Sequence, residues 1–193
     1  MTKQKILNAA AQIFGKKGYH ATSMQDIADS VNLKKASLYH HIDSKQEILR
    51  LVLEQALDLV IDRVIKATEK DIPAPQKLRL SIRNYLQTLA DNQELAAVLL
   101  LEYRSLLPEL NHIHIPHRDR FEGLWRNLIQ EILESGNFHN TDPDVATRAL
   151  LGMMNWAITW YRQDGSYSPE QIADQFTDLI LNGLMIPEST LGS

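Results

Sequence analysis

A basic N-terminal segment and an acidic remainder make up this chain of 193 residues, a length that suits one small domain and one larger body. The formal net charge is −4, yet residues 1–46 hold seven lysines and three aspartates, a net charge of +4, and the remaining residues carry −8. The basic segment is attracted to phosphate, which favours a polyanionic partner. The absence of cysteine excludes disulfides, thiol catalysis and cysteine-based zinc sites.

Apolar residues at helical spacing predict a first helix over about residues 2–17. The pattern stops near Gly15 and Gly18, because glycine is a poor helix former. The apolar stripe consists of Ile6, Ala9, Ala10, Ile13 and Phe14.

Residues 22–47 predict two short helices joined by a tight turn and followed at once by a third helix. The side chain of Ser23 is expected to accept a hydrogen bond from the backbone amide of Asp26 and so to begin the first short helix. Asn32 is expected to end it, because asparagine tolerates left-handed backbone, and the turn would bury Leu33 between the helices. This arrangement is typical of a helix-turn-helix, a DNA-reading unit.

The second short helix is predicted over about residues 34–41. Leu38 faces inward in this pattern, so the opposite face is polar and basic. That outer face consists of Lys34, Lys35, Ser37, Tyr39 and His40.

The later helices are each expected between a capping residue and a breaking residue. They are predicted over about residues 44–70, 73–91, 92–108, 116–135, 142–163 and 168–183. A capping box at Ser44–Glu47 begins the fourth helix. Asp142–Pro143 and Ser168–Gln171 are the capping devices of the last two.

Five motifs in the N-terminal part carry a family resemblance. They are Ile13-Phe14-Gly15-Lys16-Lys17-Gly18-Tyr19, Thr22-Ser23, Ile27-Ala28, Leu38-Tyr39-His40-His41 and Ser44-Lys45-Gln46-Glu47-Ile48-Leu49. Residues 3 to about 50 thereby resemble the DNA-binding end of the TetR family of bacterial transcriptional regulators. Three residues depart from the family's pattern: Asn32 replaces the turn glycine, Lys34 stands where a capping serine is common, and Ile42 replaces phenylalanine.

The resemblance implies an all-α protein of about nine helices, with a three-helix helix-turn-helix domain followed by a larger helical body. We expect the DNA-binding domain over residues 1–46 and a ligand-binding and dimerisation domain over residues 47–193.

The predicted eighth helix is apolar on nearly every side between Arg148 and Arg162. Such a helix must be covered on more than one side, and a second copy of the chain is the cover expected in a body of this size. Since the ninth helix is amphipathic, we expect both to pair with their copies in a four-helix homodimer interface; the alternative is that both are monomer core. The residues expected at the interface are Trp160, Ile172, Phe176, Leu179 and Ile180.

The C-terminal half also carries motifs of one branch of the family, namely Gly136-Asn137-Phe138, Leu151-Gly152-Met153-Met154-Asn155-Trp156 and Ser168-Pro169-Glu170-Gln171-Ile172-Ala173. They resemble regulators of fatty-acid and steroid breakdown that sense acyl-coenzyme A. The resemblance implies an apolar tunnel enclosed by helices five to eight, with phosphate-binding charge drawn from Arg104, Arg118, Arg120 and Arg126; a different hydrophobic effector is the alternative. The expected ligand-binding residues are Leu99, Tyr103, Arg104, Leu106, Arg118, Phe121, Leu124, Trp125, Leu128, Met153 and Trp156.

His112, His114 and His117 invite interpretation as a metal site, but their spacing opposes it. In a helix only His114 and His117 would be neighbours, and Pro116 disturbs an extended arrangement. We therefore expect a polar loop before helix seven and no metal. No catalytic triad, phosphate-binding glycine loop or carboxylate pair is recognised, so we expect neither enzymatic activity nor a cofactor. Without an apolar stretch of about 18 residues or a signal peptide, we expect a cytoplasmic protein without a membrane partner.

With these patterns, the TetR resemblance implies a homodimeric repressor that binds double-stranded DNA at a palindromic operator and is released by a hydrophobic effector, which the resemblance of the C-terminal half implies is an acyl-coenzyme A. The effector would tilt helix four and change the distance between the two reading heads, which must meet major grooves about 34 Å apart. The alternatives are a TetR-like activator, a drug-sensing repressor and, third, a purely structural bundle. The residues expected to contact DNA are Thr22, Ser23, Lys34, Lys35, Ser37, Tyr39, His40 and Lys45.

Overall fold

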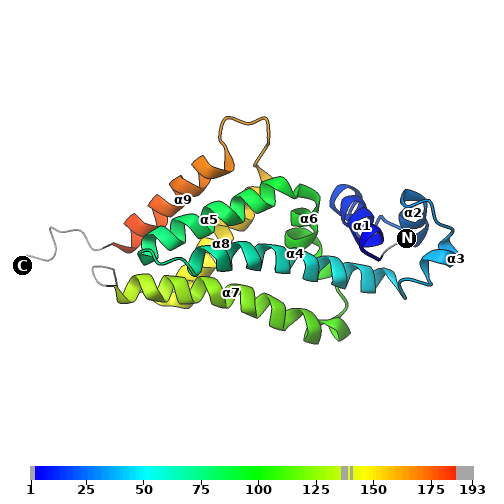
Figure 1. Cartoon of the computed structure of the whole chain (residues 1–193), viewed down its shortest axis with the longest axis horizontal. Coiled ribbons are helices and arrows are strands. Elements are labelled where there is room, and N and C mark those ends of the chain that lie inside the picture. The colour runs from blue at the N-terminus through cyan, green and yellow to red at the C-terminus, as the bar shows by residue number, and fades with distance from the viewer. Residues whose placement is uncertain (1–2, 136–138, 140, 186–193) are drawn as a thin grey trace, which may run out of the picture. The chain divides into compact units, whose positions relative to one another are not determined.

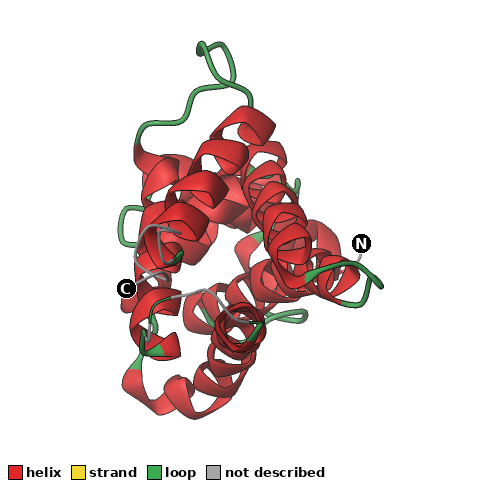
Figure 2. Cartoon of the chain, turned by 90° about the vertical axis from the view of Figure 1, so that its left-hand side faces the viewer, coloured by secondary structure: helices red, strands yellow, loops and turns green. Residues whose placement is uncertain are grey.

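The computed structural model describes residues 3–135, 139 and 141–185, and its regular structure is built from helices (Figure 1, Figure 2). The all-α prediction is confirmed, and the described residues form nine α-helices. They are α1 (Lys3–Lys17), α2 (Met24–Ser30), α3 (Lys35–Leu38), α4 (Lys45–Thr68), α5 (Ala74–Asp91), α6 (Gln93–Ala97), α7 (Asn111–Glu134), α8 (Pro143–Trp156) and α9 (Pro169–Leu184). The chain divides into two compact units, residues 1–59 with 92–118 and residues 60–91 with 119–193.

In the first unit, α2 begins and ends as the sequence predicts. The hydroxyl of Ser23 accepts from the backbone amide of Asp26 at 3.1 Å, and the Asp26 carboxylate accepts from the Ser23 amide at 2.7 Å, which completes a capping box. Asn32 has a φ of 55°, in the left-handed region. The amide of Leu33 donates to the carbonyl of Ala28 at 2.9 Å, and that of Asn32 donates to Asp29 at 3.1 Å, so the helix ends in a Schellman motif.

The core of the first unit includes apolar residues from α1 to α4. Ile6, Phe14, Ile27, Leu38 and Ile48 are all buried. Ile42 is buried as well, so isoleucine fills the place that phenylalanine takes in the family's pattern. The expected helix over residues 34–41 is shorter in the structure, because α3 ends at Leu38 and the chain continues in turns.

The expected sixth helix over residues 92–108 is wrong as a single α-helix. After α6 the chain forms a π-helix over Val98–Glu102, a 3₁₀ turn over Tyr103–Ser105 and then extended backbone at Leu106. Apolar spacing over five residues does not distinguish an α-turn from a π-turn, so the sequence pattern could not show this change. The start of the segment packs tightly on α1: a Cβ atom at Gly15 would lie 2.6 Å from the carbonyl oxygen of Glu94. Glycine is therefore required there.

The expected polar loop over residues 112–117 is also wrong, because these residues lie in the first turns of α7. Pro116 is inside the helix, whereas Pro108 takes the first position of the 3₁₀ turn Pro108–Leu110 that leads into α7. Proline suits the first turn of a helix, and Pro108 takes the role that was predicted for Pro116. The expected stop of this helix at Gly136 lies outside the described residues.

The second unit contains α5, the later part of α7, α8 and α9. Its core includes Leu78, Ile82 and Tyr85 of α5, Trp125 of α7 and Leu150 of α8, all fully buried. Ser168 and Gln171 form the expected capping box of α9, and the Asp142 carboxylate caps α8 by accepting from the Asp144 amide at 2.7 Å.

The expected eighth helix to residue 163 is too long, since α8 ends at Trp156 and a 3₁₀ turn follows over Ala157–Thr159. The hydroxyl of Thr159 donates to the carbonyl of Trp156 at 2.7 Å and so occupies an acceptor that a continuing helix would use.

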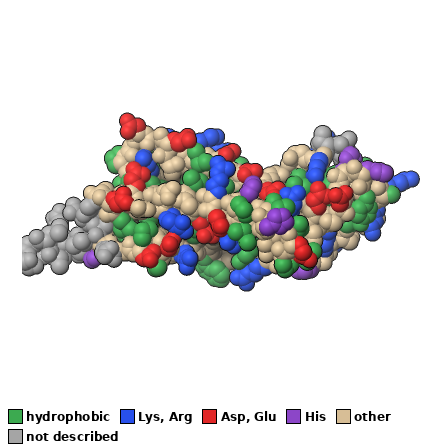
Figure 3. Space-filling view, turned by 90° about the horizontal axis from the view of Figure 1, so that it is seen from below, with side chains coloured by type: hydrophobic (Ala, Val, Ile, Leu, Met, Phe, Trp, Pro, Cys, Tyr) green, Lys and Arg blue, Asp and Glu red, His purple; other side chains and the backbone are tan. Residues whose placement is uncertain are grey.

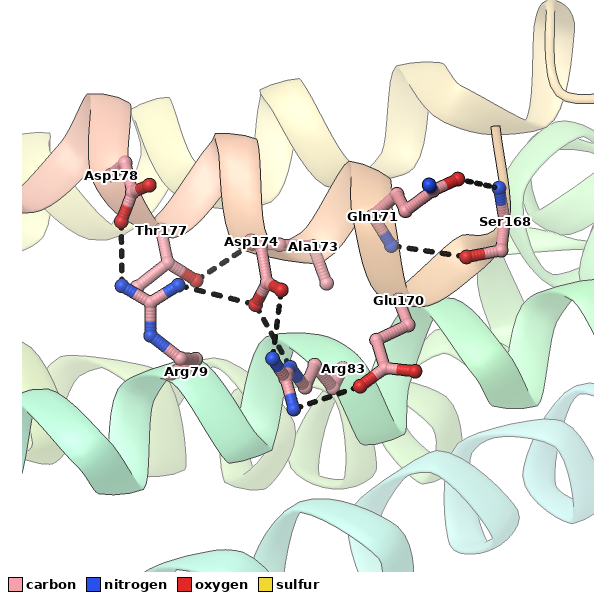
Figure 4. A network of polar contacts seen from close by, with 9 residues as sticks. All are labelled: Arg79, Arg83, Ser168, Glu170, Gln171, Ala173, Asp174, Thr177 and Asp178. Carbon is pink, nitrogen blue, oxygen red and sulfur yellow. Dashed lines mark hydrogen bonds and ion pairs between the residues drawn. The ribbon is translucent and has the colours of Figure 1, made fainter. Parts of the chain in front are cut away.

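Ion pairs fix α9 to α5 (Figure 4). Arg83 binds the Asp174 carboxylate through two bonds of 2.8 and 2.7 Å and lies 3.0 Å from Glu170. Arg79 binds Asp174 at 3.1 Å and Asp178 at 2.5 Å. Two planar guanidinium groups on one helix thus hold three carboxylates on the other, which orients the remaining faces of α9.

Candidate functional site

The outer face of α3 carries cationic and hydrogen-bonding side chains that are open to solvent. Lys34, Lys35, Tyr39 and His40 are exposed, and Ser37 is half-buried. Lys34 occupies the N-cap position with extended backbone and makes no side-chain capping bond, so its exposed ammonium group is not used by the helix end. The space-filling view shows Lys and Arg side chains, in blue, at the end of the first unit where α3 lies (Figure 3). Such a face can bind phosphates and base edges.

Two other predicted DNA contacts are engaged within the protein. Thr22 is 2% exposed, and its hydroxyl donates to the carbonyl of Gly18 at 2.8 Å. The Lys45 ammonium group donates to the carbonyls of Tyr19 and Thr22 at 2.9 and 2.8 Å and lies 4.1 Å from the centroid of the Tyr19 ring. Both residues therefore fix the turn between α1 and α2, and a direct DNA contact by either stays a prediction.

Ser23, a further predicted contact, is exposed at the start of α2. Hydrogen bonds from its amide and hydroxyl and from Lys17 lower the pKa of Asp26 to about 2. The ionised carboxylate lies 3.1 Å from the Lys17 ammonium group and partly offsets that charge. Within the described part of the chain, no carboxylate pairs with Lys34 or Lys35, which leaves their charge available to an anion.

The predicted ligand residues are divided between the two units. Leu99, Tyr103, Arg104, Leu106 and Arg118 belong to the first unit, and the other six belong to the second. In the second unit Phe121, Trp125 and Leu128 are buried, Leu124 and Met153 are half-buried, and Trp156 is 67% exposed. Of the predicted ligand-binding residues in the second unit, only Phe121, Trp125 and Leu128 are therefore part of a buried core.

A cluster of aromatic side chains lies in the core of the second unit. The ring centroid of Trp125 lies 5.8 Å from that of Tyr85 and 6.2 Å from that of Phe121. The Tyr85 hydroxyl donates to the side-chain carbonyl of Asn155 at 2.7 Å, and burial raises the pKa of Tyr85.

Three buried polar atoms near these elements have no hydrogen-bond partner among the described residues: Ser81 Oγ, Trp125 Nε1 and Thr147 Oγ1. Buried polar groups without a partner are uncommon, and each of these atoms can hydrogen-bond to a bound ligand or a water. Ser81, Tyr85 and Thr147 were not among the predicted ligand-binding residues. The spacing of Ser81 and Tyr85, one helical turn apart on α5, was the signal available.

The predicted phosphate-binding arginines differ in their surroundings. Arg104 is exposed and donates from Nε to the Tyr103 hydroxyl at 3.1 Å, whereas Arg126 pairs with Asp144. Arg118 and Arg120 are exposed.

The surfaces of α8 and α9 expose large apolar side chains. Leu179 is 64% exposed and Trp160 is 44% exposed, with its ring centroid 6.4 Å from that of the half-buried Phe176. Ile180 is half-buried, and Ile172 already belongs to the core of its own chain. Trp156, Val145 and Met185 add to the exposed apolar surface. Such a surface is typical of a protein-protein interface.

The histidines of α7 lie on different faces. His112 is exposed and its Nδ1 donates to the carbonyl of Glu109 at 2.7 Å, whereas His114 is buried. Among the described residues no group of three or more metal-ligand side chains comes together. In the same ranges, no helix has both the length and the hydropathy of a membrane span.

Two family models match the chain. "Bacterial regulatory proteins, tetR family" matches residues 6–52, and "Tetracyclin repressor-like, C-terminal domain" matches residues 71–184. The HTH-type transcriptional repressor KstR2 of Rhodococcus jostii is 25% identical over 189 residues, which cover 97% of this chain and 93% of the repressor.

Solved structures with the same fold include regulators with ligands. The TetR family transcriptional regulator PfmR from Thermus thermophilus is 38% identical, with a TM-score of 0.84 and coverage of 94% of this chain and 100% of that one. AibR in complex with isovaleryl coenzyme A and operator DNA is 26% identical, with a TM-score of 0.85 and coverage of 92% of this chain and 96% of that one. AibR binds a coenzyme A thioester and DNA in one structure.

Proposed function

The chain belongs to the TetR family of bacterial transcriptional regulators, and from that premise we propose that it is a homodimeric repressor released from a palindromic operator by a coenzyme A thioester. The observation that carries the DNA-binding part is the capped helix-turn-helix that presents Lys34, Lys35, Tyr39 and His40 outward. The matches to KstR2 and to the AibR complex support the repressor and the effector class.

We propose that DNA reading and effector binding are carried out by the two domains predicted from the sequence. Residues 1–46 read DNA, and residues 47–193 bind the effector and dimerise. In the structure the compact unit with the helix-turn-helix also includes residues 92–118. Helix α1 packs on both α2 and α6, so it connects the helix-turn-helix to a segment of the proposed effector domain and gives effector binding a route to DNA reading.

The proposed effector site uses the core of the second unit. Phe121, Trp125 and Leu128 supply apolar walls for an acyl chain, while Ser81 and Thr147 offer hydroxyls to a thioester carbonyl. The exposed Arg120 of the same unit is the proposed partner of the coenzyme A phosphates.

A selection experiment tests the proposal. The full-length protein is incubated with a library of random duplexes, and we expect an inverted repeat to be enriched. Fluorescence anisotropy then measures the operator Kd with isovaleryl-coenzyme A, hexadecanoyl-coenzyme A, free coenzyme A and hexadecanoic acid. A thioester should raise the operator Kd more than either of its parts, since each part lacks one set of contacts. Each buried methylene adds about 0.8 kcal/mol, so effector affinity should rise about fourfold per CH₂ until the site is full.

A failure of selection would contradict DNA-binding regulation itself. If a palindrome is enriched and only planar aromatic or cationic drugs release it, the chain is a drug-sensing repressor. Transcription from a promoter that carries the operator distinguishes repression from activation: we expect added protein to lower it.

A further inference from the structure

The side-chain amide of Gln46 joins separate parts of the first unit. Its Nε2 donates to the Tyr19 hydroxyl at 2.7 Å and to the carbonyl oxygen of Ser105 at 2.8 Å. Its Oε1 accepts from the backbone amide of Leu107 at 2.9 Å. Both amide hydrogens and one lone pair of the carbonyl are thus used, so the orientation of the amide is fixed from three sides.

The segment that Gln46 holds, Val98–Leu107, is here called the strap. It passes from the π-helix through a 3₁₀ turn to extended backbone within ten residues. Turns of this kind have poorer internal hydrogen bonding than an α-helix, so the strap depends on side-chain contacts for its position. Besides Gln46, the Ser105 hydroxyl lies 3.1 Å from Nε2 of His20 and donates to Glu102 at 3.3 Å.

The residues on the other side of Gln46 lead to the reading helices. Tyr19 is buried, and its ring packs edge-on against Phe14 with centroids 5.2 Å apart. Lys45, next to Gln46 in the first turn of α4, binds the carbonyls of Tyr19 and Thr22. Thr22 directly precedes Ser23, the N-cap of α2. Hydrogen bonds and adjacent residues of the chain therefore connect the strap to the start of the helix-turn-helix.

We propose that Gln46 is a positioning residue that couples the strap to the helix-turn-helix. The regulatory meaning of this coupling rests on the proposed function, because the strap lies in the chain between α5 and α7, which supply the proposed effector site. A shift of either helix reaches Ser105 and Leu107 along the chain, and Gln46 conveys it to Tyr19 and the start of α2. Coupling between two sites is reciprocal, so operator binding must in turn favour the docked strap.

Amide hydrogen exchange of the full-length homodimer tests the coupling without any effector. In the wild type, exchange over residues 103–110 should slow when the selected operator is bound. Gln46→Ala should speed exchange there by about fivefold in the free protein and remove the response to operator. Gln46→Glu keeps an acceptor for the Leu107 amide but loses the donor to Ser105, so its effect should be intermediate. The control is Gln55→Ala, because Gln55 lies on the same helix and, among the described residues, its amide hydrogen-bonds only with Asn8 and Gln4.

Tyr19→Phe separates coupling from local packing. It removes only the hydroxyl that Gln46 binds, so it should speed exchange over residues 103–110, which Tyr19 influences through Gln46. In a Gln46→Ala background the same substitution should add nothing.

Wild-type exchange over residues 103–110 in Gln46→Ala, or additive effects of the two substitutions, would overturn the proposal. If no operator is selected, the proposed function fails, whereas the exchange rates of the free variants still decide whether Gln46 holds the strap to Tyr19.

Discussion

The exposed surface of α3 and the exposed surface of α8 and α9 differ in chemistry, and the difference indicates two kinds of partner. On α3 the outward residues include Lys34, Lys35 and His40, which water solvates well. On α8 and α9 they include Trp156 and Leu179, whose exposure costs about 25 cal/mol per Å² of apolar surface. The apolar surface of α8 and α9 therefore favours a stable protein-protein interface. The basic surface of α3 is well solvated when free and can bind a polyanion reversibly.

A charge on the apolar surface should have the largest effect. Leu179→Asp places a carboxylate at a position that we expect to face the second copy, so the dimer should dissociate. Light scattering should then give the chain mass of 22.0 kDa instead of twice that value. Since one head alone binds half of a palindrome, operator affinity should fall by at least about 100-fold.

The matched control is Asn127→Asp, which adds the same charge at an exposed position of α7. It should leave both the mass and the operator affinity unchanged. A Leu179→Asp protein that stays dimeric would place the interface elsewhere.

Two lysine substitutions test the basic surface around α3 and separate a DNA contact from a structural role. Lys35→Ala should reduce operator affinity about tenfold and lower the salt slope of binding by about one, without a change in stability. Lys45→Ala should also lower the free energy of unfolding, by about 1–3 kcal/mol, because the carbonyls of Tyr19 and Thr22 lose their donor. Anisotropy over a range of salt concentrations and urea unfolding measure the two effects. Equal stability of both variants would contradict the structural role of Lys45.

A fall in pH should lower the stability of the first unit, because His114 of α7 is buried there. Burial, Arg118 and His117 lower its pKa and Glu54 opposes them, so the folded protein resists protonation of a side chain that the unfolded chain protonates near pH 6.5. The free energy of unfolding should therefore fall as pH drops below about 6.5 and level off once the folded form is protonated. His114→Leu should flatten this part of the pH profile in urea unfolding, whereas His112→Gln, on an exposed face of the same helix, should retain it. An unchanged profile in His114→Leu would contradict this assignment.

The smallest effect concerns the turn of the helix-turn-helix. Asn32 has a φ of 55°, a conformation that glycine adopts without strain. Asn32→Gly should change the free energy of unfolding by no more than about 0.5 kcal/mol, while Asn32→Ala should lower it by about 1 kcal/mol. A larger loss in the glycine variant would show that the asparagine side chain itself stabilises the turn.

Local capping chemistry made the helix-turn-helix predictable. Ser23 caps α2 through a bond to backbone three residues away, and Asn32 ends α2 with left-handed backbone, so both roles follow from the sequence alone, as does that of Ser168 at the start of α9. The exposed cations of α3 followed from helical spacing in the same way.

The contacts that the sequence did not reveal are long-range ones. Gln46 meets Ser105 and Leu107 at a separation of about sixty residues, and Ser81, Trp125 and Thr147, whose polar atoms have no partner in the described part of the chain, come from three different helices. Such contacts depend on packing, which no local pattern specifies. The predicted ligand-binding residues coincide only partly with the buried core for the same reason. Trp156 was assigned to a pocket wall from helical spacing, but its side chain is 67% exposed in the single chain.

Native mass spectrometry of the protein with its selected palindrome tests the central claim most directly. We expect one duplex with two chains, and on addition of isovaleryl-coenzyme A or a longer thioester we expect free duplex together with a thioester-bound dimer. A complex that contains one chain, or a thioester-bound dimer that still holds the duplex, would contradict the account.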